Sequence, residues 1–131
     1  MADAKSPVER PLSPHLQIYK LTLTMAMSII HRITGAALYV GTLLLALFLI
    51  ATASGKAGHA LASAIYGSLF GKLVLFGYTW ALLHHMLGGI RHFIWDTGAG
   101  LDPVGRETIS KATLIGSVTL TLLVWIIVGT K

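Results

Sequence analysis

The sequence predicts an all-α membrane protein with three transmembrane helices and a cytoplasmic N-terminal segment. Of its 131 residues, 54% are hydrophobic and only 11% are charged, whereas a soluble domain carries roughly 25% charged residues. Three uncharged stretches, each long enough to cross a bilayer, occupy most of the chain and leave no room for a second domain. Each stretch should be helical, because a helix satisfies the hydrogen bonds of its own backbone in lipid.

We therefore expect a single membrane-anchor domain over residues 1–131. It consists of an N-terminal segment at 1–23 followed by transmembrane helices at 24–52, 64–94 and 109–130. The last helix contains the uncharged run between Lys111 and Lys131, which is rich in Leu, Val, Ile and Thr on every side.

Charged residues mark the ends of the first two spans. The 23 residues between Arg32 and Lys56 cover about 35 Å as a helix, more than a hydrocarbon core of roughly 30 Å. The 18 residues between Lys72 and Arg91 are just sufficient if both cations snorkel to the membrane surface. We therefore expect this helix to begin earlier, near Ala64.

The distribution of Lys and Arg predicts the orientation in the membrane. With three crossings, seven of these residues share the side of the N-terminus and three lie opposite: Lys5, Arg10, Lys20, Arg32, Arg91, Arg106 and Lys111 against Lys56, Lys72 and Lys131. This asymmetry places the N-terminus in the cytoplasm. The opening MADAKSPVERPLSPHL resembles neither a secretory signal nor a transit peptide, which favours a bacterial inner membrane.

The connectors between the spans are predicted to be loops, and the absence of cysteine limits the cofactors that the chain can hold. The stretch ATASGKAGHALASA is predicted to be a short outer loop, and DTGAGLDPVGRE an inner loop with four Gly and Pro residues. The chain has no cysteine, so it can hold no disulfide or thiolate-ligated iron–sulfur cluster, and any metal must be held by His or oxygen.

The second span carries LLHHMLGGIRHFIWD, and polar residues at this depth are functional candidates. His85 shares a helical face with Gly88, Gly89 and His92. An imidazole beside a strip without side chains suits a haem ligand. An equally weighted alternative is that the glycines admit a neighbouring helix and His85 forms a hydrogen bond across that interface. His84 points roughly 100° away, which favours a packing role.

The first span carries a second polar group on one face, formed by Ser28, His31, Arg32 and Gly35. Snorkelling explains an arginine at the edge of a span. The functional alternative is that a hydroxyl, an imidazole and a fixed cation bind a quinone carbonyl and the carboxylates of a haem propionate. Both polar groups lie at the same end of their helices and can meet.

These two groups, with RPLSPHLQIY ahead of them, closely resemble the cytochrome b membrane-anchor subunit of succinate dehydrogenase, respiratory complex II. One motif runs from RPLSPHL through SIIHRIT, and the other is HMLGGIRHFIWDTG, beginning at His85. Together they cover about half of the chain. His15, in the first motif, is interpreted as part of a docking surface for soluble subunits.

The resemblance implies a mechanism. In this family the anchor pairs with a second membrane subunit, and each supplies one axial histidine to a shared haem b. His85 matches the ligand position, His31 and Arg32 match residues near the haem propionates, and Ser28 with Arg32 matches this subunit's side of the ubiquinone pocket. A flavoprotein oxidises succinate, and an iron–sulfur subunit passes the electrons to ubiquinone.

Two alternatives remain open at this point. One is an anchor for a menaquinol-linked fumarate reductase, which shares the architecture. The other is a structural anchor or small transporter in which the histidines only pack helices. The chain alone lacks a flavin-binding domain and a dinucleotide motif, so we expect the succinate chemistry to reside in its partners.

Overall fold

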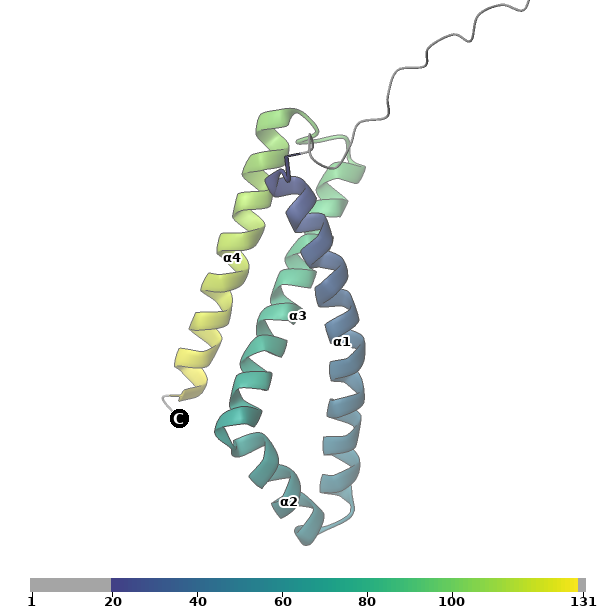
Figure 1. Cartoon of the computed structure of the whole chain (residues 1–131), viewed down its shortest axis with the longest axis vertical. Helices are drawn as coiled ribbons and strands as arrows, with labels where there is room; N and C mark the ends of the chain where they lie inside the picture. The colour runs from purple at the N-terminus through teal and green to yellow at the C-terminus, as the bar shows by residue number, and fades with distance from the viewer. Residues whose placement is uncertain (1–19, 130–131) are drawn as a thin grey trace, which may run out of the picture.

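The computed structural model describes residues 20–129 and contains four helices joined by short turns (Figure 1). In chain order these are α1 (Leu23–Ala53), α2 (Lys56–Gly67), α3 (Leu69–Asp96) and α4 (Pro103–Gly129). Helices α1, α3 and α4 are long and apolar enough to cross a membrane, and no strand occurs in the described part of the chain. The predicted all-α class with three spans is confirmed; most of the N-terminal segment, with His15, lies outside the described residues.

The connector between the first two spans is a helix, and the predicted outer loop is wrong over most of its length. Helix α2 packs against both α1 and α3, and it ends at a corner formed by Ser68. The Ser68 hydroxyl accepts a hydrogen bond from the Gly71 amide at 3.0 Å and so caps α3. A Cβ on Gly71 would contact the carbonyl oxygen of Ile65, so only glycine fits this corner without rearrangement. The membrane helix therefore begins at Leu69 rather than near residue 64.

Helix α4 begins at Pro103, six residues before the predicted start at 109. The Asp102 carboxylate accepts a hydrogen bond from the Gly105 amide at 2.8 Å. A proline in the first helical position after an acidic cap is a common start to a helix, because its missing N–H would be unpartnered there anyway. Gly98 and Gly100, with φ of 82° and 66°, turn the chain between α3 and α4.

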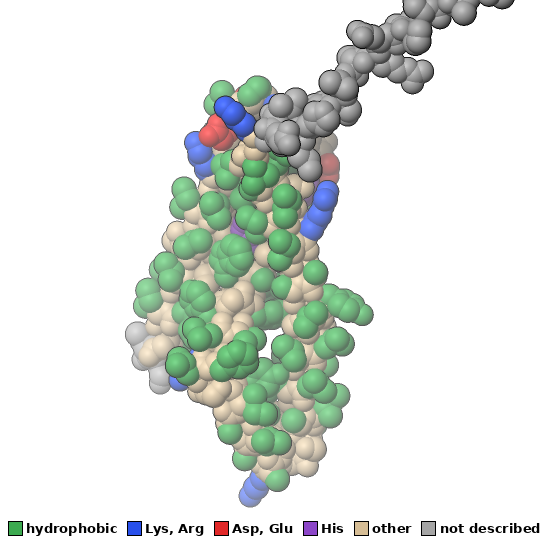
Figure 2. Space-filling view, viewed as in Figure 1, with side chains coloured by type: hydrophobic (Ala, Val, Ile, Leu, Met, Phe, Trp, Pro, Cys, Tyr) green, Lys and Arg blue, Asp and Glu red, His purple; other side chains and the backbone are tan. Residues whose placement is uncertain are grey.

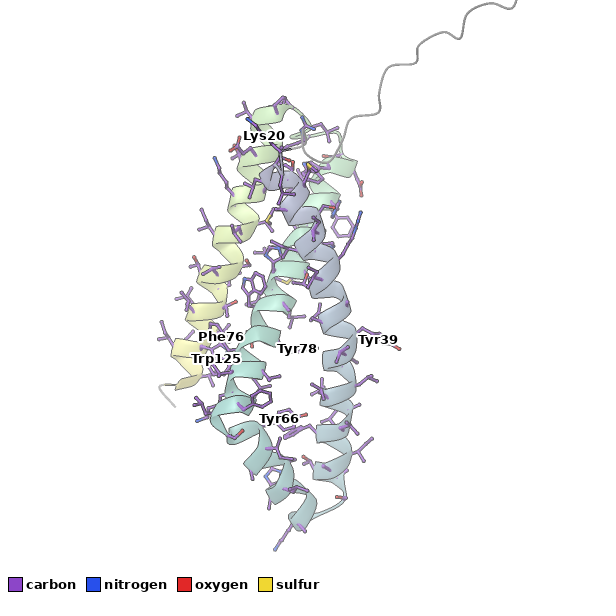
Figure 3. The ribbon with its side chains drawn as sticks, in the orientation of Figure 1. Lys20, Tyr39, Tyr66, Phe76, Tyr78 and Trp125 are labelled. Carbon is purple, nitrogen blue, oxygen red and sulfur yellow. The ribbon has the colours of Figure 1, made fainter. Side chains whose placement is uncertain are left out.

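Glycines bring α1 and α3 into close contact as they run antiparallel. An added Cβ at each of three glycines would meet a side chain of the other helix; the pairs are Gly35 with His85, Gly41 with the Tyr78 ring, and Gly88 with His31. Figure 3 shows Tyr78 pointing from α3 towards α1. The three pairs share one register and hold the two helices together over half of the span.

The interface between α3 and α4 is polar, and the outer surface of the bundle is apolar. The buried residues of α4 are all hydroxylic, and His84 and Arg91 of α3 lie against this helix; we call these residues the polar seam: Ser110, Thr113, Ser117 and Thr121 with His84 and Arg91. Hydrophobic side chains cover the visible face (Figure 2). Small and hydroxylic residues at helix contacts, with apolar residues facing outwards, are typical of membrane bundles.

Candidate functional site

The two polar groups predicted from the sequence meet through their histidines. The imidazole rings of His31 in α1 and His85 in α3 stack with centroids 3.9 Å apart and planes 6° from parallel. His92, two turns further along α3, lies 5.4 Å from the His31 ring. His31, His85 and His92 form what we call the histidine cluster, at the end of the bundle where α1 begins.

Backbone and hydroxyl contacts orient His85. Its Nδ1 lies 3.1 Å from the backbone oxygen of His31 and 3.3 Å from the Thr34 hydroxyl. The Thr34 hydroxyl itself donates to the His31 carbonyl at 3.0 Å. Both neighbours can therefore accept, which places the proton of a neutral imidazole on Nδ1. In this tautomer the other nitrogen, Nε2, carries the lone pair, and it forms no hydrogen bond with residues 20–129.

Three glycines near the cluster have different roles. An added Cβ on Gly35 would lie 3.0 Å from Cε1 of His85, so this glycine leaves room for the imidazole. Gly88 is buried beneath the His31 ring, as the helix-packing interpretation required. A Cβ on Gly89 would meet nothing within 4 Å. The strip predicted to be free of side chains is thus open at Gly89 and filled by His31 at Gly88.

Ser28 and Arg32, also candidates from the sequence, are exposed on α1. Neither forms a hydrogen bond or ion pair within residues 20–129. The cation and hydroxyl predicted for quinone binding therefore face away from the chain's own core and are accessible to a partner or ligand.

His84 belongs to the polar seam. Its ring is fully buried, and Nδ1 lies 3.0 Å from the Ser117 hydroxyl, which donates its own proton to Leu114. His84 therefore donates from Nδ1, and its Nε2 is buried without a partner. This geometry agrees with the packing role predicted for His84.

Arg91 was missed as a candidate, because the sequence placed it at the membrane boundary as a snorkelling residue. The structure buries it between α3 and α4 with 2% of its surface exposed, so the snorkelling interpretation is wrong. Its guanidinium carbon lies 5.1 Å from the centre of the Trp95 ring. The spacing of seven residues from His84 was the available signal, since it puts both side chains on one helical face.

The histidine cluster offers one oriented histidine ligand rather than a complete metal site. Within residues 20–129, no group of three or more His, Asp or Glu side chains is arranged to hold a metal ion. His85, however, presents an oriented nitrogen with its other nitrogen bonded to a carbonyl, the arrangement typical of metal-ligating histidines. A metal cofactor bound through His85 would therefore need its other ligands from outside residues 20–129.

Comparison with known proteins gives the family. Residues 6–124 match the family model described as "Succinate dehydrogenase/Fumarate reductase transmembrane subunit". The chain is 42% identical over 118 residues to the succinate dehydrogenase cytochrome b556 subunit of Paracoccus denitrificans, covering 90% of this chain and 91% of that protein.

Two further relatives are also named as cytochrome b subunits of succinate dehydrogenase. The mitochondrial succinate dehydrogenase cytochrome b560 subunit of Sus scrofa is 41% identical over 122 residues, which cover 92% of this chain and 69% of that protein. The cytochrome b556 subunit of Rickettsia felis is 34% identical over 118 residues, 90% of this chain and 92% of that protein. The chain thus belongs to the transmembrane subunit family of succinate dehydrogenase and fumarate reductase, as a cytochrome b anchor subunit of succinate dehydrogenase.

Proposed function

We propose that this anchor subunit binds haem b through His85 and forms part of a ubiquinone site with Ser28 and Arg32, so that electrons from succinate oxidation enter the quinone pool. The observation that carries the proposal is the hydrogen bond from His85 Nδ1 to the His31 carbonyl, which leaves Nε2 free. The family supports the assignment to haem and to succinate dehydrogenase, because its named relatives are cytochrome b subunits of succinate dehydrogenase.

The histidine cluster positions His85 for this role. The His31 carbonyl and the Thr34 hydroxyl hold the Nδ1 proton, which fixes the tautomer and raises the basicity of Nε2. Stacking against His31 fixes the ring orientation. The haem, when bound, supplies a one-electron redox centre. A histidine of the second membrane subunit would hold the haem together with His85.

Ser28 and Arg32 lie on the exposed side of the same turns of α1. Arg32 carries a permanent charge and a planar fork of donors, which suits a haem propionate carboxylate and the quinone oxygen. The positive charge stabilises negative charge that develops on this oxygen during reduction, and the Ser28 hydroxyl orients the ring. His31 contributes a further polar group near the propionates.

The complete enzyme includes the flavoprotein, the iron–sulfur subunit and the second membrane subunit. Succinate oxidation takes place in the soluble partners. We propose that this chain lies in a bacterial inner membrane with its N-terminus in the cytoplasm, so that the histidine cluster lies near the soluble subunits. All three relatives described above are named for succinate dehydrogenase, which favours succinate oxidation over fumarate reduction as the physiological direction.

The test is a dithionite-reduced minus oxidised absorption spectrum of the purified complex, for the wild type, His85→Ala and His59→Ala. His59 is an exposed histidine on α2 and serves as the matched control. We expect a b-type band in the wild type and in His59→Ala, and its loss in His85→Ala. Co-purification of all four subunits shows that the variant assembles, and a normal band in assembled His85→Ala complex would refute the ligand assignment.

A further inference from the structure

The buried guanidinium of Arg91 has no counter-ion within residues 20–129. Its Nε and Nη1 atoms are buried and form no hydrogen bond. No acidic residue of the described chain pairs with Arg91: Glu107 pairs with Lys111 at 2.8 Å, Asp102 caps α4, and Asp96 forms no ion pair. Burial of a permanent charge without a partner is strongly unfavourable, so an anion from elsewhere is required.

Other donors next to Arg91 lack partners as well. The Ser110 hydroxyl of α4 is fully buried with no hydrogen bond. It lies level with Arg91 across the polar seam, since the register that pairs His84 with Ser117 also brings residues 91 and 110 opposite each other. The Trp95 indole N–H, on the ring beneath the guanidinium, is also buried and unpartnered. A cation and two neutral groups able to donate are the chemistry that binds phosphate oxygens.

A groove of about 160 Å³ between α3 and α4 leads to this point, and Arg91 lines it. Its other walls are almost entirely apolar and include Leu87, Ile90 and Ile94 of α3 with Ile109 of α4. Ile90 and Ile94 are exposed on the outer surface of the bundle. The groove therefore combines an apolar wall with a cation, as an amphiphile with an acidic headgroup requires.

The depth of the site agrees with a lipid headgroup. Arg91 lies five residues before the end of α3 at Asp96, about 8 Å along the helix axis. Phosphates of a bilayer leaflet lie near the ends of membrane helices, and anionic lipids are attracted to basic residues there. The site adjoins the histidine cluster, because the Trp95 ring packs edge-on against the His92 ring with centroids 5.4 Å apart, but Arg91 lines the groove on the side of α4.

From these contacts we infer that Arg91 binds the phosphate of an anionic phospholipid, whose acyl chain lies in the groove between α3 and α4. The lipid is an integral part of the folded subunit, because it supplies the counter-charge that the chain lacks. The lipid site shares no residue with the proposed haem and quinone sites.

The experiment counts bound lipids on the whole complex. The four-subunit enzyme is placed in nanodiscs containing phosphatidylglycerol and phosphatidylcholine, released gently, and analysed by native mass spectrometry. We expect Arg91→Gln to hold one phosphatidylglycerol fewer per copy of this chain, and Arg91→Lys to keep it. Arg106→Gln, an exposed arginine at the same end of the bundle, is the matched control and should bind lipid like the wild type.

A second variant covers the case in which Arg91→Gln does not assemble. Ala112 lines the groove, and Ala112→Leu fills it while leaving the charge in place. Loss of one phosphatidylglycerol from this variant supports the inference, and unchanged lipid content refutes it. The inference is also refuted if Arg91→Gln keeps its lipid but releases a subunit or loses the haem band, since the counter-ion is then a protein carboxylate or a haem propionate.

Discussion

Replacing Gly88 and Gly89 by alanine, one at a time, isolates the close contact between α1 and α3 at the histidine cluster. A Cβ on Gly88 meets the His31 ring, with Cε1 at 2.9 Å, whereas a Cβ on Gly89 meets nothing within 4 Å. His31 has little freedom to move, because its ring stacks on His85 and its carbonyl accepts two hydrogen bonds.

The expected difference follows from two contributions. Each substitution removes a glycine from the interior of a helix, which favours the helix by about 1 kcal/mol. This contribution is common to both variants and cancels in the comparison. Overpacking of a tight contact, which costs about 1–3 kcal/mol, applies to Gly88→Ala alone. We therefore expect Gly88→Ala to be less stable than Gly89→Ala by about 1–3 kcal/mol.

The free energy of unfolding can be measured by titrating the chain in mixed micelles with sodium dodecyl sulfate. The three tryptophans, Trp80 and Trp95 in α3 and Trp125 in α4, report the loss of helix packing by fluorescence. Far-ultraviolet circular dichroism gives an independent curve. Equal stability of the two variants, or a more stable Gly88→Ala, would show that α1 and α3 do not approach as described.

Two further predictions concern the polar seam and the quinone site. Ser117→Ala removes the only hydrogen-bond partner of His84 in the described chain and should lower the free energy of unfolding by about 1–3 kcal/mol; Ser117→Thr keeps the hydroxyl, and equal losses in the two variants in the same titration would contradict this explanation. Arg32→Gln should slow ubiquinone reduction by succinate about 10²-fold, the scale for losing one donor at a developing negative charge, while succinate oxidation by a soluble artificial acceptor stays normal. A parallel fall in both activities would instead assign Arg32 to assembly.

The three spans were predictable because their cause is local. Length and hydropathy alone place α1 within one residue of its predicted ends. The meeting of His31 with His85 was also expected, because both residues lie at the same end of their helices. Their ring stacking and the His31 carbonyl contact were not, since these depend on the rotation of one helix about its axis relative to the other.

The predictions that the structure contradicts also have physical explanations. The uncharged run of the third span begins after Lys111, so the predicted helix started only at 109; α4 starts at Pro103 because Asp102 and Pro103 form a helix start in the polar region. The small residues between the first two spans were interpreted as a loop, yet the spacing of apolar residues in KAGHALASAIYG suits a short amphipathic helix. The spacing of Arg91 from His84 shows that the two share a helical face, but the burial of Arg91 could not be predicted, because it depends on α4 packing over that face.

The short turn at Ser54 and Gly55 has a practical consequence for locating the protein in the membrane. Gly55 has a φ of 110°, and both residues are exposed between the end of α1 and the start of α2. Inside α2, by contrast, a Cβ on Gly58 would contact the backbone of Ala51. An epitope or biotin-acceptor peptide is therefore best inserted between residues 54 and 55. There it lies about 35 Å along α1 from the histidine cluster, and its labelling from one side of sealed vesicles reveals which compartment each end of the bundle faces.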